Sequence, residues 1–320
     1  MEQLVDKIVN VTFDELDDQK LPLNEKYGLV VNYKDVDYKF LIHIREDAAK
    51  LMAFGSGVLP ETEIEKFRGR PLFKRQSWDN KKEMDFSTIF YDDPTRTTFP
   101  NLRGGWAVGS KEDWYLENIA KIFEKIFYVY NIENEDVVFY SSSMGGFMSI
   151  QLGTFLPKTT VWADIPQTDL KKYSHYKYLK KEIFEDNVDL EKYNVRLDCI
   201  ELMNRMNYVP EIYLVMDISD YDLKNHFYPF VKRLYDFDKD IFEKNIKFLI
   251  NPIEAHSFLK YEQFILLKNK YFVDTKFDDI EFFSVIRGTD IDVKLEKISD
   301  INTVIEDMEK LINEEKSNLE

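Results

Sequence analysis

A strand-to-helix turn in the middle of the chain carries the residues best suited to covalent chemistry. Val137 to Tyr140 is a continuous apolar stretch of strand length, and Phe147 to Phe155 repeats apolar residues at helical spacing. Between them stands the run Ser141-Ser142-Ser143-Met144-Gly145-Gly146. A serine on a tight turn of this kind is exposed at the end of a sheet, where its hydroxyl can attack an acyl carbon.

Only one serine of this run fits the steric demands of such a turn. The residues two before and two after the nucleophile must be small, because the turn is strained and the helix passes close to the strand. Ser143 has Ser141 and Gly145 at these positions, whereas Ser142 would place Met144 at the second one. We therefore expect Ser143 to be the nucleophile.

The same turn predicts a site that stabilises an oxyanion. The backbone amide of Met144 lies at the start of the helix, where it can face negative charge that develops on a substrate. A second donor usually comes from the loop after an earlier strand. Gly55-Ser56-Gly57 follows the predicted strand Lys50 to Phe54, so we assign the second donor to Ser56.

A serine hydroxyl needs a histidine base, and the chain has four histidines. His43 lies inside a predicted strand, His175 lies in a polar insertion and His226 lies within a predicted helix. His256 differs, because it follows the predicted strand Ile246 to Ile250 through a short loop. This position matches the chain order of nucleophile, acid and base, so we expect His256 to be the base.

A carboxylate that orients the base should follow the predicted strand Glu211 to Met216. The loop after this strand contains Asp217, Asp220 and Asp222. Asp217 stands immediately at the strand end, while Asp220 stands three residues further, where the chain has room to turn towards His256. We expect Asp220 to be the acid, with Asp222 and Asp217 as the alternatives.

Substrate-binding residues are expected in the loops around this turn. Gln167 stands at the end of the strand after the turn and is the first candidate to contact a substrate. Loops before the turn supply arginines and tryptophans that suit anionic groups and sugar rings. We expect Arg75 and Trp106 to contact the substrate; the same loops also contain Arg70, Trp78, Arg96 and Arg103.

The elements that must position these residues alternate between strand-length and helix-length patterns. This order predicts an α/β protein with a mainly parallel central sheet of about eight strands and helices on both faces. At the start, Tyr27 to Tyr33 and Tyr38 to Arg45 are two β-rich runs that predict a hairpin beside the parallel strands.

One large domain accounts for residues 1–271, with insertions at about 61–84 and 170–207. Residues 272–320 form an acidic extension that we expect to pack on or flank this domain. Its last part, Ile301 to Lys316, has the pattern of an amphipathic helix and is a candidate contact for a protein partner.

Composition excludes several classes of function. Asp and Glu number 59 against 43 Lys and Arg, and the resulting net charge of −16 disfavours binding to nucleic acid or to an anionic membrane. The only cysteine, Cys199, allows no intramolecular disulfide and is expected to be a small buried residue. The N-terminal residues lack a secretory signal and no apolar run is long enough to span a bilayer, so we expect a cytoplasmic protein.

Cofactor motifs are absent from the sequence. Pro60 occupies the position where a dinucleotide-binding loop after Gly55 would need its third glycine. Neither a phosphate-binding lysine loop nor a His-Glu-x-x-His or EF-hand spacing occurs. We expect no bound cofactor and no metal.

The chain resembles bacterial α/β-hydrolase proteins associated with the assembly of surface polysaccharides or glycoproteins. The similarity covers roughly residues 40–270 and departs from the commonest turn by carrying Ser141 in place of glycine. The segments that carry it are the SSSMGG turn, Asp164-Ile165-Pro166-Gln167, Asp220 before His226 and Pro229-Phe230, Glu254-Ala255-His256, Asp93-Pro94-Thr95 and Gly105-Trp106.

The resemblance implies an α/β-hydrolase fold and ester chemistry on a glycan. Some relatives are O-acetyltransferases, including those of accessory Sec secretion systems, so acetyl-CoA is a candidate acyl donor. The chain is accordingly expected to be a serine esterase or O-acyltransferase that acts on a small molecule or a glycan. The alternative is a non-catalytic scaffold of the same fold that binds a glycan-assembly or secretion partner.

Overall fold

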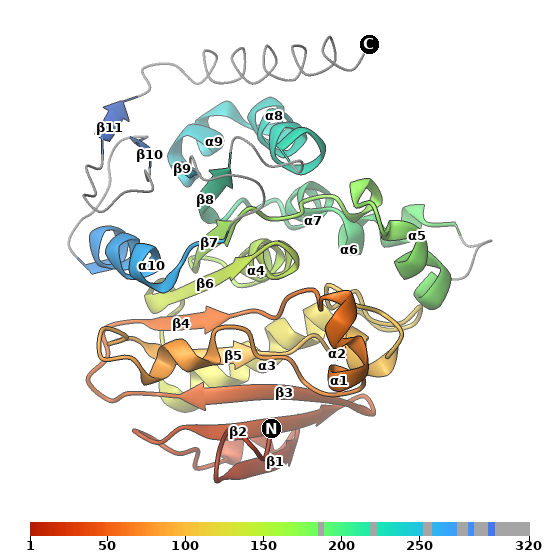
Figure 1. Cartoon of the computed structure of the whole chain (residues 1–320), viewed down its shortest axis with the longest axis vertical. Helices are drawn as coiled ribbons and strands as arrows, with labels where there is room; N and C mark the ends of the chain where they lie inside the picture. Colours follow the sequence, from red (N-terminus) through yellow and green to blue (C-terminus); the bar gives the residue numbers. More distant parts are fainter. Residues whose placement is uncertain (185–188, 218–222, 252–257, 274–280, 285–293, 298–320) are drawn as a thin grey trace.

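A mixed sheet runs through the part of the chain that the computed structural model describes. That part comprises residues 1–184, 189–217, 223–251, 258–273, 281–284 and 294–297. Within it, eleven strands follow the order β1-β2-β3-β5-β4-β6-β7-β8-β9-β10-β11 from one edge to the other (Figure 1). Their bounds are β1 Ile8–Thr12, β2 Tyr27–Tyr33, β3 Val36–His43, β4 Leu51–Phe54, β5 Ser87–Tyr91, β6 Val137–Ser142, β7 Thr160–Asp164, β8 Glu211–Asp217, β9 Ile246–Asn251, β10 Glu281–Ser284 and β11 Lys294–Lys297.

The central eight strands have the arrangement of the α/β-hydrolase fold. β2 and β3 form the predicted hairpin, and β3 also pairs antiparallel with β5. From β5 through β4, β6, β7 and β8 to β9, every pairing is parallel. The prediction of a mainly parallel sheet with about eight strands is confirmed for β2 to β9.

Strands at both edges of the described sheet go beyond the prediction. β1 pairs parallel with β2 and lies in a segment for which no element was expected. At the other edge, β10 pairs parallel with β9, and β11 pairs antiparallel with β10. Both of these strands belong to the segment predicted as an acidic extension, whose predicted helix Ile301 to Lys316 lies outside the described residues.

Helices alternate with the strands as the sequence predicts. The helix expected after the serine turn is α4. The short helices α1, α2 and α9 were not predicted. The bounds are α1 Ile64–Phe67, α2 Pro94–Thr98, α3 Tyr115–Tyr130, α4 Met144–Phe155, α5 Tyr176–Leu179, α6 Asn194–Leu197, α7 Cys199–Met206, α8 Tyr228–Phe237, α9 Lys239–Asn245 and α10 Tyr261–Lys268.

Side chains of the parallel strands divide between two hydrophobic cores, because successive residues of a strand point to opposite faces. In β6, Phe139 belongs to the core that contains α3, α4 and α7, whereas Tyr140 belongs to the core that contains α10. In β7, Val161 and Trp162 divide in the same way. Both faces of the sheet are therefore covered, which explains why these strands read as continuous apolar runs.

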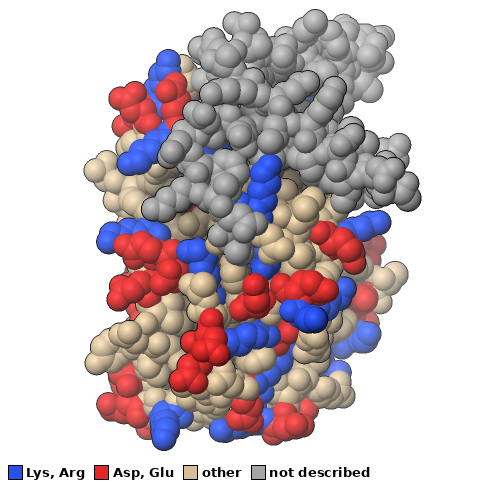
Figure 2. All heavy atoms as spheres, turned by 90° about the vertical axis from the view of Figure 1, so that its left-hand side faces the viewer, with Lys and Arg blue, Asp and Glu red and all other residues tan. Residues whose placement is uncertain are grey.

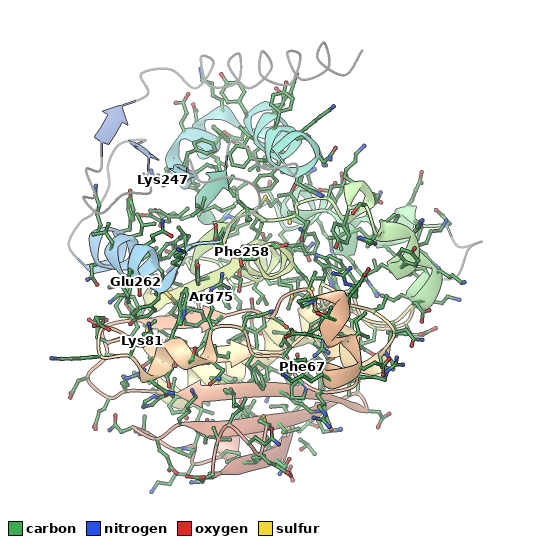
Figure 3. All side chains as sticks on the ribbon, in the orientation of Figure 1. Phe67, Arg75, Lys81, Lys247, Phe258 and Glu262 are labelled. Atoms are coloured by element: carbon green, nitrogen blue, oxygen red, sulfur yellow. The ribbon has the colours of Figure 1, made fainter. Side chains whose placement is uncertain are left out.

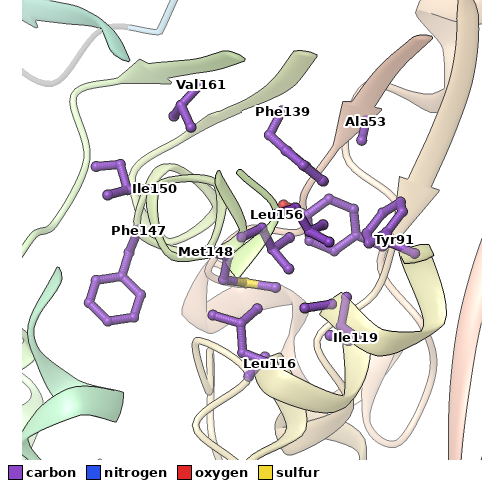
Figure 4. Packing of buried hydrophobic residues seen from close by; sticks show 14 of the residues in the cluster. Ala53, Tyr91, Leu116, Ile119, Phe139, Phe147, Met148, Ile150, Leu156 and Val161 are labelled. Atoms are coloured by element: carbon purple, nitrogen blue, oxygen red, sulfur yellow. The ribbon is translucent and has the colours of Figure 1, made fainter. Parts of the chain in front are cut away.

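The helix that follows the serine turn is enclosed almost completely. All residues of α4 except Phe155 are buried, and the helix packs on β6 and β7. Figure 4 shows Met148 of α4 on the side where Leu116 and Ile119 of α3 lie. A helix buried on all sides holds its N-terminus in one place, which fixes the end of the serine turn relative to the sheet.

On the face that Figure 2 presents, acidic and basic side chains of the described residues interleave, and neither sign of charge forms a separate block. Cys199 is fully buried at the start of α7, as expected, and burial raises the pKa of its thiol. Among the described residues, no helix has the length and apolar character needed to cross a membrane.

Candidate active site

Ser143 occupies the junction between β6 and α4 in a strained backbone conformation. Its φ of 54° and ψ of −120° lie in a region that residues with a side chain rarely adopt. The Ser143 amide donates a hydrogen bond of 2.9 Å to the carbonyl oxygen of Asp164 at the end of β7. Strain that the surrounding structure imposes is typical of functional positions, and it turns the Ser143 side chain out of the strand.

Close contacts explain why small residues surround Ser143. A Cβ atom on Gly145 would lie 2.4 Å from the carbonyl oxygen of Ser56 and 2.7 Å from Cβ of Ser141. A Cβ atom on Gly55 would lie 2.7 Å from Oγ of Ser141. Ser141, which replaces the more common glycine, fits because its hydroxyl oxygen accepts a hydrogen bond from the Gly55 amide. The steric argument for the register of the turn therefore agrees with the packing.

The Ser143 hydroxyl is part of a short hydrogen-bond chain. Nε2 of Gln167 donates to Oγ of Ser143 at 2.8 Å. Nε1 of Trp106 donates to Oε1 of Gln167 at 3.3 Å, which fixes the orientation of the amide. Gln167 and Trp106 are buried, with 1% and 4% of their surface exposed. The two predicted substrate contacts Gln167 and Trp106 are thus linked to Ser143.

Trp106 is held by a buried carboxylate. Its φ of 51° and the φ of 50° at Ala107 both lie in the left-handed region. The Asp93 carboxylate accepts hydrogen bonds from the amides on either side of Trp106, at 2.6 Å from Gly105 and 3.0 Å from Ala107. Burial raises the pKa of Asp93. This carboxylate therefore stabilises the strained loop that presents Trp106.

The predicted oxyanion donors lie on the two segments that meet at the turn. Met144 is the first residue of α4, so its amide belongs to the N-terminal turn of a twelve-residue helix. Ser56 follows β4, and its peptide lies against the first turn of α4, where Gly145 leaves room for it. The Ser56 hydroxyl donates to the carbonyl oxygen of Leu72 at 2.9 Å, so only the amide of Ser56 remains for an oxyanion.

A cavity of about 620 Å³ opens at Ser143. This volume lies within the ~300–1,000 Å³ range of small-molecule sites. Its described lining contains three cations, Lys74, Arg75 and Arg103, and no carboxylate. Burial lowers the pKa of Lys74. The other lining residues are Ser56, Gly57, Val58, Pro60, Ser142, Ser143, Gln167, Tyr173, Phe258 and Leu259.

Arg75, a predicted substrate contact, lies in the wall of the Ser143 cavity. Its backbone is left-handed, with φ of 62°, and Nη2 donates to Oγ of Ser142 at 2.8 Å. The guanidinium carbon lies 5.1 Å from the ring centre of Tyr140 and 6.0 Å from that of Phe258, within the range of cation–π attraction. Arg75 and Phe258 lie close together between α10 and the N-terminal half of the sheet (Figure 3).

The remaining aromatic and basic candidates have different surroundings. Arg103 lines the cavity, and Trp78 packs on Arg75. Arg96 is 1% exposed and donates to the carbonyl oxygens of Phe67 and Arg70, so it organises the backbone and does not reach the cavity. Arg70 is not among the residues that line the Ser143 cavity.

The predicted base and acid, His256 and Asp220, lie outside the described residues, as does the alternative Asp222. Asp217 is the last residue of β8. The carboxyl ends of β8 and β9 lie beside the carboxyl end of β7, on the side of the sheet where Ser143 follows β6. Past residue 257 the described chain resumes at Phe258 in the cavity wall, and the Leu259 amide donates to Oδ2 of Asp164 at 3.0 Å. The triad partners of Ser143 therefore remain predictions.

The other three histidines have partners away from Ser143. Nδ1 of His43 lies 3.1 Å from Oδ2 of Asp79, His175 precedes α5, and His226 is buried with Nδ1 3.4 Å from the Thr168 amide. None of the three hydrogen-bonds to Ser143 within the described part of the chain. Among those residues, no group of three or more His, Cys, Asp or Glu side chains is placed to hold a metal ion.

Comparison with known proteins finds similarity in structure only, since no family model and no curated protein matches the sequence. The Glycosylation Associate Protein (Gap123) complex from Streptococcus agalactiae aligns over 77% of this chain and 47% of that chain, with a TM-score of 0.54 and 14% identity. A candidate esterase from Staphylococcus aureus aligns over 82% and 90%, with a TM-score of 0.50 and 10% identity.

A third similar structure is a capsule O-acetyltransferase of Neisseria meningitidis serogroup A. It aligns over 75% of this chain and 94% of that chain, with a TM-score of 0.48 and 16% identity. The chain spans about half of the length of the Streptococcus agalactiae chain it matches. At these identities, the similarity to the first two proteins establishes a common fold, in agreement with the resemblance found in the sequence.

Proposed function

We propose that this protein is a serine-dependent acyl esterase or O-acyltransferase with Ser143 as its nucleophile. The observation that carries the proposal is the strained backbone of Ser143 at the end of β6, with its side chain at the wall of a 620 Å³ cavity. Strain at a residue with a side chain persists only where the surrounding packing enforces it. Here Gly55 and Gly145 leave space for that packing, which a simple connection between a strand and a helix would not require.

The mechanism uses the predicted triad. Oγ of Ser143 attacks the acyl carbon while His256 accepts its proton, and Asp220 orients His256. Gln167 supports this step because its Nε2 donates to Oγ, which leaves the hydroxyl hydrogen of Ser143 to point at the base. The amides of Met144 and Ser56 bind the oxyanion that forms on the acyl oxygen.

Three cations in the cavity wall support an anionic acyl donor. In a chain with net charge −16, Lys74, Arg75 and Arg103 line the described part of the Ser143 cavity, and no carboxylate belongs to that lining, although Arg103 also contacts Glu61 behind it. Such a surface attracts phosphate or carboxylate groups. An acyl thioester that carries phosphates, such as acetyl-CoA, has this chemistry, and a glycan hydroxyl is the proposed acceptor.

A fluorophosphonate probe tests the central assignment. The probe should label the wild-type protein on Ser143, because an activated serine reacts far faster than a surface hydroxyl. Ser143→Ala should abolish labelling, whereas Ser77→Ala, which removes an exposed serine, should leave it intact. Equal labelling of Ser143→Ala and the wild type would refute the nucleophile assignment, and no labelling of a folded wild-type protein would favour the non-catalytic scaffold.

A further inference from the structure

A second cavity of about 280 Å³ adjoins the one at Ser143. Val58, Arg103 and Tyr173 line both cavities, so these three residues form the boundary between them. The second cavity is further lined by Glu61, Ile64, Asn101, Leu102, Gly104, Trp106, His175, Tyr178, Leu179, Lys181 and Glu182. Of these residues, the proposed mechanism involves only Trp106, through its contact with Gln167.

Aromatic rings form a continuous row along the second cavity. Ring centres lie 4.9 Å apart between Trp106 and Tyr173, 5.6 Å apart between Tyr173 and His175, and 5.8 Å apart between His175 and Tyr178. We call these four residues the aromatic row. Its inner end, Trp106, is 4% exposed and its outer end, Tyr178, is 54% exposed. The row therefore leads from solvent to the residue that contacts Gln167.

Polar groups of both charges accompany the aromatic row. Arg103 donates to Oε1 of Glu61 at 3.2 Å, and Lys181, Glu182 and Asn101 also line the cavity. A polyanion would meet the two carboxylates, whereas a neutral polyol finds both donors and acceptors. Apolar ring faces together with mixed donors and acceptors fit a carbohydrate, which has C–H faces and hydroxyl groups.

The inner end of the aromatic row is aligned on the nucleophile. Trp106 donates to Gln167, and Gln167 donates to Oγ of Ser143. The backbone of Trp106 is held in the left-handed region by Asp93. A molecule on the row therefore lies beside the side chains that hold Ser143, and its end reaches the nucleophile across the boundary formed by Val58, Arg103 and Tyr173.

We propose that the second cavity is the acceptor subsite and binds one end of a neutral glycan. The proposal rests on the acyl transfer proposed above. A glycan hydroxyl oxygen forms a bond to the acyl carbon of acyl-Ser143, the bond between that carbon and Oγ breaks, and the hydroxyl proton passes through the base to Oγ. The products are the O-acyl glycan and free Ser143.

Separate cavities give a physical reason for transfer in competition with water. The phosphate-bearing donor occupies the cavity lined by Lys74, Arg75 and Arg103, while the acceptor is bound on the aromatic row of the second cavity. A bound hydroxyl reaches the acyl-enzyme with a high effective concentration, which water in the open cavity lacks. Loss of a ring from the row should therefore change the partition between transfer and hydrolysis.

Tyr178 is the best residue for the test, because it is 54% exposed and its replacement disturbs little packing. The full-length protein is supplied with acetyl-CoA and, in turn, with chitotriose, cellotriose, maltotriose and mannotriose. Acetylated glycan and free acetate are measured together by mass spectrometry and an acetate assay. Tyr178→Ala should lower the ratio of transfer to hydrolysis about tenfold, as expected for the loss of one aromatic contact.

Two controls make the outcome specific. Tyr178→Phe keeps the ring and should retain most of the wild-type ratio, and Tyr128→Ala removes a 74% exposed tyrosine of α3 and should leave the ratio unchanged. An unchanged ratio in Tyr178→Ala, with transfer intact in the wild type, would overturn the acceptor subsite and leave the proposed function standing. A wild-type protein that releases acetate but acetylates none of the glycans would refute glycan transfer, and the subsite with it.

Discussion

Replacement of Gln167 by methionine tests how the nucleophile is positioned. The change keeps an unbranched side chain of similar length but removes the Nε2 donor that lies 2.8 Å from Oγ of Ser143. A buried hydrogen bond that loses one partner costs ~1–3 kcal/mol. If this bond acts on the reacting oxygen, the cost appears in the transition state and kcat should fall by about 5- to 150-fold.

The assay is steady-state hydrolysis of p-nitrophenyl acetate, with thermal unfolding measured in parallel. Gln167→Met should lower kcat while KM changes little, because Gln167 contacts the nucleophile. Gln151→Met is the matched control, since Gln151 is a fully buried glutamine of α4 whose Nε2 donates to the carbonyl oxygen of Val195.

Wild-type kcat in a folded Gln167→Met variant would refute the positioning role of Gln167. A rise in KM with kcat unchanged would instead assign the side chain to substrate binding, as the sequence alone suggests. An equal loss of kcat in Gln151→Met would mean that the effect reflects general destabilisation of the fold.

Three further outcomes are expected. His256→Ala and Asp220→Asn should each lower activity by roughly 10²-fold or more; an inactive Asp222→Asn beside a fully active Asp220→Asn would move the acid within the loop. Gly145→Ala should destabilise the fold by ~1–3 kcal/mol in chemical denaturation, since its Cβ would lie 2.4 Å from a backbone oxygen, and wild-type stability would contradict the packing described. Burial raises the pKa of Asp92 from 3.8 to about 6, so its stabilising contribution is complete below pH 3.8 and is lost as the pH rises through 6; Asp92→Asn should flatten the pH dependence of Tm in that interval, and an unchanged pH profile would contradict it.

Much of the fold follows from the sequence because buried parallel strands leave a strong signal. β4 and β6 agree with their predicted bounds within a residue or two. Each is covered on both faces, so each reads as an apolar run bounded by polar residues. Ser143 could be chosen within its turn for a related reason, since the crowding at Gly145 is a local property of the chain.

Elements that depend on distant partners escaped prediction. β1 is a short edge strand that pairs in parallel with β2, and nothing within its five residues signals that pairing. The short helix α2 did carry a signal, because Asp93 and Pro94 are a typical helix cap and first helical residue. A search for such caps would have found it.

For the site, too, single residues could be predicted from the sequence, whereas the contacts between them could not. Sequence reasoning selected Gln167, Trp106 and Arg75 one at a time, and the structure joins the first two to Ser143 and places Arg75 in the same cavity wall. The role of Asp93 as an acceptor for both amides beside Trp106 depends on two loops that meet only in the folded chain. The aromatic row likewise joins Trp106 to Tyr173, His175 and Tyr178, which lie 67 to 72 positions further along the chain.

Direct observation of the acyl-enzyme is the most direct test of the account. The protein is mixed with acetyl-CoA or p-nitrophenyl acetate, quenched in acid during turnover and digested, and the peptides are analysed by mass spectrometry. One acetyl group should appear on Ser143 of the wild-type protein and be absent from Ser143→Ala. Turnover without acetyl on Ser143, or with acetyl on another residue that reacts at the same rate in Ser143→Ala, would contradict the nucleophile assignment on which the account depends.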